Sequence, residues 1–288
     1  MLISGEALLG GPTARRQFQY LPEAPLCDEE CRGAMSLMTH SADENTVKKK
    51  MKQTFAYRQS MVLDSQLSSN VLSYLPRFKD VTGLIEQAFV LMFGEDVSGK
   101  LLENWPTMFK EKIIKQCRKL PSTTDLDDLL LAADPQKDDA GGADFGWDSD
   151  ISSILLLLHL VPPTAQGRKK PGKMSASRAE KHLVVFKKSG TSIEEHLNTI
   201  TSSAQTYLLA VGTQRNRISQ YFIILDKNAI PCMSNSSLSA FDELFKAHFV
   251  FGTSYHTVLH NMYTFIQTTV YNINVGKLSY RVHPPTHH

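Results

Sequence analysis

Three histidines lie close together near the C-terminal end of the chain, in the stretch HFVFGTSYHTVLH. His256 and His260 are four residues apart, and on a helix this spacing turns both imidazoles to one face, as in zinc proteases of the HExxH type. Catalytic zinc takes three protein ligands and a water, so His248 would be the third ligand. Thr257, however, stands where such proteases have their glutamate base, and no acidic residue follows Glu243. The pattern favours structural histidines, and a metal-dependent hydrolase stays an alternative.

Two cysteines near the N-terminus form a second candidate ligand set. Cys27 and Cys31 have a C-x3-C spacing, and His40 follows them. A structural zinc module needs a second pair of ligands, and none follows nearby. We therefore interpret both cysteines as free thiols.

Acidic residues around position 147 could suggest a magnesium site made of Asp144, Asp148 and Asp150. They lie in a segment rich in Gly and Asp, where charges typically only solvate a linker. The sequence contains neither a GxxxxGK[ST] phosphate loop nor a GxSxG nucleophile motif. We expect no catalytic residue and no cofactor.

The strongest basic run is QGRKKPGK, with Arg168, Lys169, Lys170 and Lys173. Such a run can be a nuclear localisation signal or an anion-binding loop that contacts phosphate. The simpler interpretation is a solvated loop. A nucleic-acid-associated protein would combine this loop with the basic face of a preceding helix, which comprises Lys48, Lys49, Lys50, Lys52 and Arg58.

Composition limits these alternatives. The chain has 288 residues, with 31 basic and 29 acidic side chains, so its net charge is only +2. A dedicated nucleic-acid binder usually has a larger basic excess. The longest apolar run, 154–161, is too short to cross a bilayer, and the N-terminus lacks the basic region of a signal peptide. We expect a soluble protein of the cytoplasm or nucleus, without membrane partners.

The elements that would position these residues fall into two regions. Before an acidic Gly/Asp linker at 134–147, amphipathic periodicity predicts helices at 44–62, 83–94, 106–119 and 124–133. The remaining boundaries are a poorly ordered N-terminus at 1–43, a helical region at 44–133, an α+β domain at 148–276 and a tail at 277–288.

The second region contains both helical and strand-like sequence patterns. Helices are predicted at 151–161, 177–188, 192–200, 237–249 and 254–271. Three β-rich stretches lie between them, at 207–211, 218–225 and 229–233. The predicted fold is α+β, with a mainly helical N-terminal region followed by a small three-stranded antiparallel sheet packed with helices.

Several long phrases resemble the C-terminal region of the sterile alpha motif domain-containing protein 3-like family. They are MKQTFAYRQSMV, PRFKDVTGLIEQAFVLMFGEDVSGKLLENWP, ILLLLHLVPPTAQGRKK and AFDELFKAHFVFGTSYHTVLHNMYTFIQTTVYNI, within residues 44–275. The resemblance implies no established activity for this region. Family members often carry an N-terminal sterile alpha motif, a five-helix oligomerisation module for which residues 1–43 leave no room. Self-association is therefore not assumed.

Every catalytic pattern considered lacks at least one obligatory partner. We therefore expect a non-enzymatic intracellular interaction or scaffold protein that binds an unknown protein partner. The alternatives are the nucleic-acid-associated protein that uses the basic loop, and the metal-dependent hydrolase.

Overall fold

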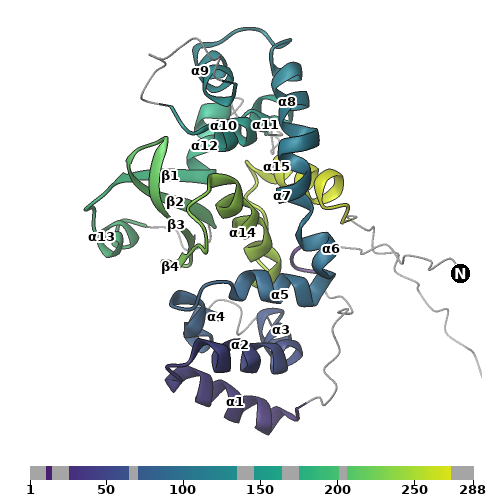
Figure 1. Ribbon diagram of the computed structural model, residues 1–288, viewed down its shortest axis with the longest axis vertical. Helices are drawn as coiled ribbons and strands as arrows, with labels where there is room; N and C mark the ends of the chain where they lie inside the picture. Colours follow the sequence, from purple (N-terminus) through teal and green to yellow (C-terminus); the bar gives the residue numbers. More distant parts are fainter. Residues whose placement is uncertain are drawn as a thin grey trace, which may run out of the picture.

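The computed structural model describes residues 11–14, 26–64, 71–134, 146–163, 175–200 and 206–273. Helices form both ends of the elongated molecule, and a twisted sheet lies on one side of its middle (Figure 1). A central helix, α14 (Ser237–Val250), runs between the sheet and the other helices. The α+β class predicted from the sequence is confirmed.

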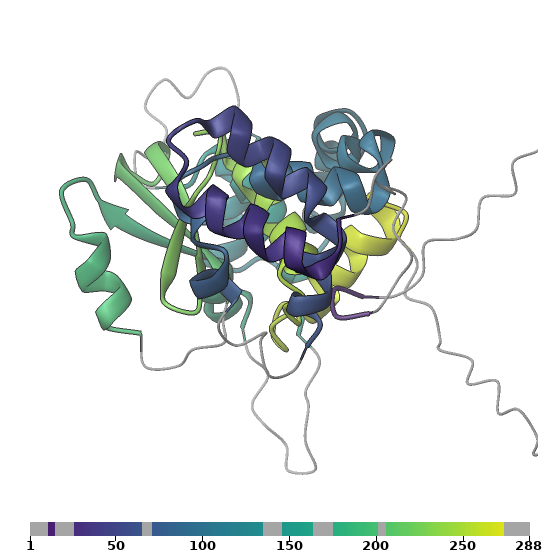
Figure 2. The ribbon, with the colours of Figure 1, turned by 90° about the horizontal axis from the view of Figure 1, so that it is seen from below.

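The lower end of the molecule consists of short helices from the first part of the chain, and Figure 2 shows α1 and α2 side by side across it. Their bounds are α1 (Asp28–His40), α2 (Glu44–Gln53), α3 (Phe55–Val62), α4 (Val71–Tyr74), the 3-10 helix η2 (Pro76–Lys79) and α5 (Leu84–Phe93). The expectation of a poorly ordered segment at 1–43 is wrong for α1. This helix buries Cys31, Ala34 and Met38, a spacing of three and four residues that forms one apolar face.

The helices between α5 and the sheet run from beside α5 to the upper end of the molecule (Figure 1). They are α6 (Glu95–Ser98), α7 (Lys100–Asn104), the π-helix η3 (Trp105–Phe109), α8 (Lys110–Cys117), α9 (Thr124–Ala133), α10 (Ser149–Leu155), α11 (Leu157–Leu160) and α12 (Ala176–Leu183). The predicted apolar helix at 151–161 is interrupted at Leu156, and it ends before Pro162 and Pro163, as expected from the missing N–H of proline.

The sheet has four strands in the order β1-β2-β3-β4, so the prediction of three antiparallel strands is wrong. The strands are β1 (Val184–Lys188), β2 (Tyr207–Gln214), β3 (Arg217–Leu225) and β4 (Asn228–Pro231). The helix predicted at 177–188 ends at Leu183, because the β-branched and aromatic residues that follow form β1. Strand β1 pairs with β2 in parallel, whereas the other pairs are antiparallel.

A parallel pair needs a crossover, and helix α13 (Ile193–Asn198) lies in the connection between β1 and β2. It covers one face of the sheet, where Ile193 and Leu197 pack on Tyr207, Leu209 and Phe222. The alternate residues of β2 and β3 face the main core on the side of α14. Both faces of the sheet are therefore buried in its central strands.

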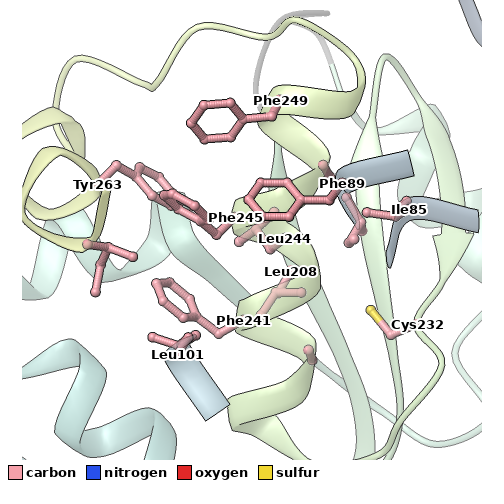
Figure 3. Packing of buried hydrophobic residues seen from close by; sticks show 14 of the residues in the cluster. Ile85, Phe89, Leu101, Leu208, Cys232, Phe241, Leu244, Phe245, Phe249 and Tyr263 are labelled. Atoms are coloured by element: carbon pink, nitrogen blue, oxygen red, sulfur yellow. The ribbon is translucent and has the colours of Figure 1, made fainter. Parts of the chain in front are cut away.

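The core is built around α14, whose residues from Ala240 to Val250 are all buried. Figure 3 shows Phe241, Phe245 and Phe249 along this helix, with Phe89 of α5 on one side and Tyr263 on the other. Tyr263 belongs to α15 (His260–Phe265), which continues into the π-helix η4 (Ile266–Val270). Buried residues from both sides of the predicted linker join in this cluster, so one continuous core replaces the two separate cores expected.

Charged side chains are buried within this core and neutralise one another. The Lys246 ammonium lies 2.5 Å from a carboxylate oxygen of Glu86 on α5 and 2.5 Å from one of Asp242. The hydroxyl of Tyr271 donates to Asp242, and the Lys246 Nζ lies 5.6 Å from the ring centroid of Phe89. Burial raises the pKa of Asp242 to about 6, although Lys246 opposes the shift. The cluster connects the N-terminal helices, α14 and the C-terminal segment.

Candidate functional site

A cavity of about 620 Å³ opens at the upper end of the molecule, between α9, α10, α11, α12 and the turn that joins β2 to β3. We call it the acidic cavity. Its polar lining includes Asp125, Asp128, Asp148, Glu180 and Arg215, and its apolar lining includes Leu129, Leu131, Leu155, Leu158 and Trp147. These residues come from segments that are separate in the sequence, so the tertiary fold creates the cavity.

Trp147 forms one wall of the acidic cavity. Its indole N–H donates to Glu180 of α12 at 2.7 Å, and its ring meets Phe186 of β1 edge to face at 6.4 Å. The guanidinium carbon of Arg215 lies 5.3 Å from the ring centroid. Contacts with α12, the sheet and the β2–β3 turn therefore fix the orientation of the indole.

Asp148 holds the adjoining end of α10 in place. Its carboxylate accepts from the backbone N–H groups of Asp150 and Ile151 as the N-cap. The same carboxylate accepts from the hydroxyl of Ser237 at 2.6 Å, which joins α10 to the start of α14. Leu155 then faces the cavity from a helix whose position is fixed at its N-terminus.

Arg215 lies in the β2–β3 turn, and the hairpin that carries it is irregular near its tip. The pairing register shifts on both sides of Gly212. A Cβ at this position would lie 2.2 Å from the carbonyl oxygen of Arg217, so only glycine permits this close approach of the two strands. Bulges increase the local twist of a hairpin, and the turn residues Arg215 and Asn216 line the cavity.

The cavity has an excess of negative charge, since four carboxylates line it together with one guanidinium. The sixth titratable group is His159, whose pKa is lowered by burial, with Asp125 opposing the shift. Its Nε2 is buried and has no hydrogen-bond partner among the described residues. At neutral pH the described lining therefore carries four negative charges and one positive charge.

Both serine hydroxyls of the lining are already engaged. Ser149 Oγ donates to the carbonyl oxygen of Ala133 at 2.5 Å, and Ser177 Oγ donates to the Asp125 carboxylate. Neither donates to a histidine, as an activated nucleophile would. The arrangement suits recognition of a ligand by shape and charge.

The three histidines considered as metal ligands are not brought together. His248 is buried in α14 and its Nδ1 lies 2.9 Å from the hydroxyl of Thr253, while burial lowers its pKa to about 4. His256 precedes α15, which begins only at His260, so the helical spacing assumed for this pair is wrong. His256 instead stacks on His182 of α12, with ring centroids 4.4 Å apart. Among the described residues no group of three or more potential ligands could hold a metal ion.

The cysteine pair also lacks a third ligand. Cys27 is the N-cap of α1 and Cys31 lies one turn further on. His40 is the last residue of the same helix, about 14 Å from Cys31 at the usual rise per residue. All four cysteines of the chain are free thiols.

The other acidic and basic candidates separate in the same way. Asp148 caps α10, and Asp150 forms an ion pair with Lys110 at 2.6 Å. Residues that fall outside the described part of the chain are Asp144, the basic loop with Arg168, Lys169, Lys170 and Lys173, and most of the linker at 134–147.

The basic face expected at 44–62 is smaller than the sequence suggested. Arg58 is buried, and it donates to the carbonyl oxygen of Met51 and to the Thr54 hydroxyl. Its guanidinium carbon lies 5.9 Å from the ring centroids of Phe55 and Phe78. The helix breaks at Thr54, and Arg58 lies with Phe55 and Val62 on the buried face of α3.

One stretch of the chain partly matches the phosphate-loop motif. The stretch GEDVSGKL at 94–101 has the glycines and lysine of the GxxxxGK[ST] motif, but Leu101 replaces the Ser or Thr that binds magnesium. It follows helix α5, not a strand, and residues Glu95–Ser98 form α6. Lys100 donates to the carbonyl oxygen of Tyr271 at 3.0 Å. These contacts are structural.

The acidic cavity itself was not foreseen. Trp147 was available as a signal, because a tryptophan beside a polar linker needs a partner for its N–H and an apolar surface for its ring. Glu180 and Arg215, by contrast, belong to patterns typical of solvent-exposed helix and turn positions. Only the packing of α9, α12 and the hairpin brings them to Trp147.

Comparison with known proteins gives a match to a family model. Residues 27–79 match the family model described as sterile alpha motif domain-containing protein 3, helical domain. No curated protein and no solved structure matched the chain. The matched segment extends from the N-cap of α1 to the end of η2, at the opposite end of the molecule from the cavity. Within the described ranges, no helix is both long and apolar enough to span a membrane.

Proposed function

We propose that this chain, whose residues 27–79 are a helical domain of the sterile alpha motif domain-containing protein 3-like family, is a non-enzymatic interaction protein. It binds a segment of a protein partner in the acidic cavity. The helical domain and the sheet serve as the scaffold that holds the cavity lining in place.

One observation carries this proposal. The cavity combines an apolar floor, made by buried Leu155 and Leu158, with carboxylates at its rim and the exposed side chain of Leu131. Pockets of roughly 300–1,000 Å³ with apolar walls and a few polar groups are typical binding sites. The hydroxyls of Ser149 and Ser177, already bonded to other acceptors, support binding over covalent chemistry.

The free thiols support a reducing compartment, so we place the protein in the cytoplasm or the nucleus. Cys31, Cys117 and Cys232 are buried, and burial raises the pKa of each of them. A raised thiol pKa disfavours the reactive thiolate.

Site-specific photo-cross-linking in cells tests the binding role of the cavity. A benzophenone amino acid replaces Leu131, which lines the cavity and is 44% exposed. The matched control carries the same group at Leu102, which is 40% exposed on α7 and does not line the cavity. We expect discrete protein adducts at position 131 that do not form at position 102. Identical adducts at both positions, or none at position 131, would contradict the proposal.

A further inference from the structure

We infer that the acidic cavity recognises a positively charged side chain of its peptide ligand, arginine in particular, together with an apolar neighbouring residue. This inference rests on the proposed function, because it names the chemistry of the segment that the cavity binds.

The first argument is the imbalance of charge. Asp125, Asp148 and Glu180 accept from Ser177, Ser237 and Trp147, which are all neutral donors. These hydrogen bonds orient the carboxylates without neutralising them. Asp128 is a further exposed carboxylate on α9, and among the described residues that line the cavity Arg215 is the only Lys or Arg. A cation would therefore enter a region whose potential is opposite in sign to the net charge of +2 of the chain.

The second argument is that the cavity already holds a guanidinium. Arg215 lies over the indole of Trp147, while Glu180 accepts from the N–H of the same indole. An aromatic face beside a carboxylate is the environment that a planar, weakly hydrated guanidinium prefers over an ammonium. Arg215 is exposed, so an incoming arginine can displace it from the ring.

The third argument is the apolar part of the lining. Leu129 and Leu131 expose apolar surface to the cavity, and the buried side chains of Leu155 and Leu158 lie behind it. The volume of about 620 Å³ also lies in the middle of the range for pockets that hold drug-sized ligands. A peptide with a leucine-like residue beside the arginine fills this space, whereas a small free cation leaves it to water.

Binding of defined peptides to the purified full chain tests the inference. The probe is a capped, dye-labelled heptapeptide with arginine at its centre, leucine on each side of the arginine and alanine at the other positions. The control peptide has citrulline in place of arginine, because citrulline is nearly isosteric with arginine but neutral. Fluorescence anisotropy gives Kd. Trp147 emission reports the location, because the only other tryptophan, Trp105, is fully buried and donates to Ser153. We expect the arginine peptide to bind at least tenfold more tightly than the citrulline peptide.

Two variants separate recognition from folding. Arg215→Ala removes the internal cation and uncovers the indole, so the arginine peptide should bind about fivefold more tightly. An unfolded protein cannot produce this gain. Asp128→Asn should weaken binding about fivefold. Asp127→Asn makes the same change on α9 at a residue that accepts from Ser122 and does not line the cavity, and it should leave Kd unchanged.

Several results would overturn the inference. Equal Kd values for the arginine and citrulline peptides would remove the role of charge. If free agmatine displaces the labelled peptide at the same concentration as unlabelled arginine peptide does, the cavity recognises a small cation and not a peptide. Failure of every peptide to bind, with the cross-link at Leu131 retained, would refute only the ligand chemistry. Loss of that cross-link would refute the proposed function itself.

Discussion

Glu243 offers the sharpest test of the buried electrostatics. It lies on α14, is almost fully buried, and its Oε2 accepts from the backbone N–H of Met233 at 3.0 Å. Burial raises its pKa from 4.5 to about 7; the hydrogen bond from Met233 opposes this shift, Asp242 and Glu86 add to it, and Lys246 opposes it more weakly. The ionised form is therefore less favourable in the folded chain than in the unfolded chain.

The size and sign of the effect follow from linkage. Because the folded pKa is raised, the stabilising contribution of Glu243 is complete below about pH 4.5 and is lost as pH rises through about 7. At about 1.4 kcal/mol per pH unit, this loss reaches about 3 kcal/mol by pH 8. Glutamine imitates the neutral acid and keeps an oxygen that can accept from Met233. We expect Glu243→Gln to raise the free energy of unfolding by about 3 kcal/mol at pH 8 and by almost nothing at pH 4.

Urea unfolding followed by far-ultraviolet circular dichroism at pH 4, 6 and 8 measures this difference. Glu111→Gln makes the same change at an exposed position of α8 and should alter stability by less than about 0.5 kcal/mol at each pH. If the Glu243→Gln variant is less stable than the unmodified chain at pH 8, the folded protein stabilises the ionised carboxylate of Glu243, which contradicts the raised pKa.

Four further substitutions test other parts of the fold. Lys246→Met leaves two carboxylates without their cation and should destabilise the chain by about 3–5 kcal/mol at pH 8 in urea unfolding. Gly212→Ala must displace the carbonyl of Arg217; we expect a loss of about 1–3 kcal/mol in thermal unfolding and weaker binding of the arginine peptide. Phe222→Ala should lower the free energy of unfolding by about 3 kcal/mol. Phe265→Ala should lower it by less, because Phe265 is only partly buried, and urea unfolding of both variants measures the difference.

Local sequence patterns predicted elements whose ends have clear chemical causes. The acidic first turn of α9 predicted its start at Thr124, and Gly94 predicted the end of α5. The Ser192 to Glu195 spacing predicted the start of α13, where the Ser192 hydroxyl accepts from the N–H of Glu195 at 3.1 Å. In each case the determining contact lies within four residues, so the sequence contains the whole signal.

Elements that depend on distant partners were missed. Strand β1 follows α12 without a turn residue between them, and its strand form depends on pairing with β2. The late start of α15 depends on Tyr255, which stacks on Tyr263 at 4.8 Å and donates to Gln267. The acidic cavity belongs to the same class, because its wall, rim and floor come from different parts of the chain.

The central position of α14 has a consequence for how the chain folds during synthesis. Gln59 donates to the carbonyl oxygen of Val250 across 191 residues of sequence, and Glu86 pairs with Lys246 across 160. The early helices can therefore complete their packing only after α14 has been synthesised, and their apolar faces stay uncovered until then. Such long-range closure slows folding and exposes intermediates to aggregation. In cells, the production of this protein should therefore depend on chaperone capacity more strongly than its size suggests.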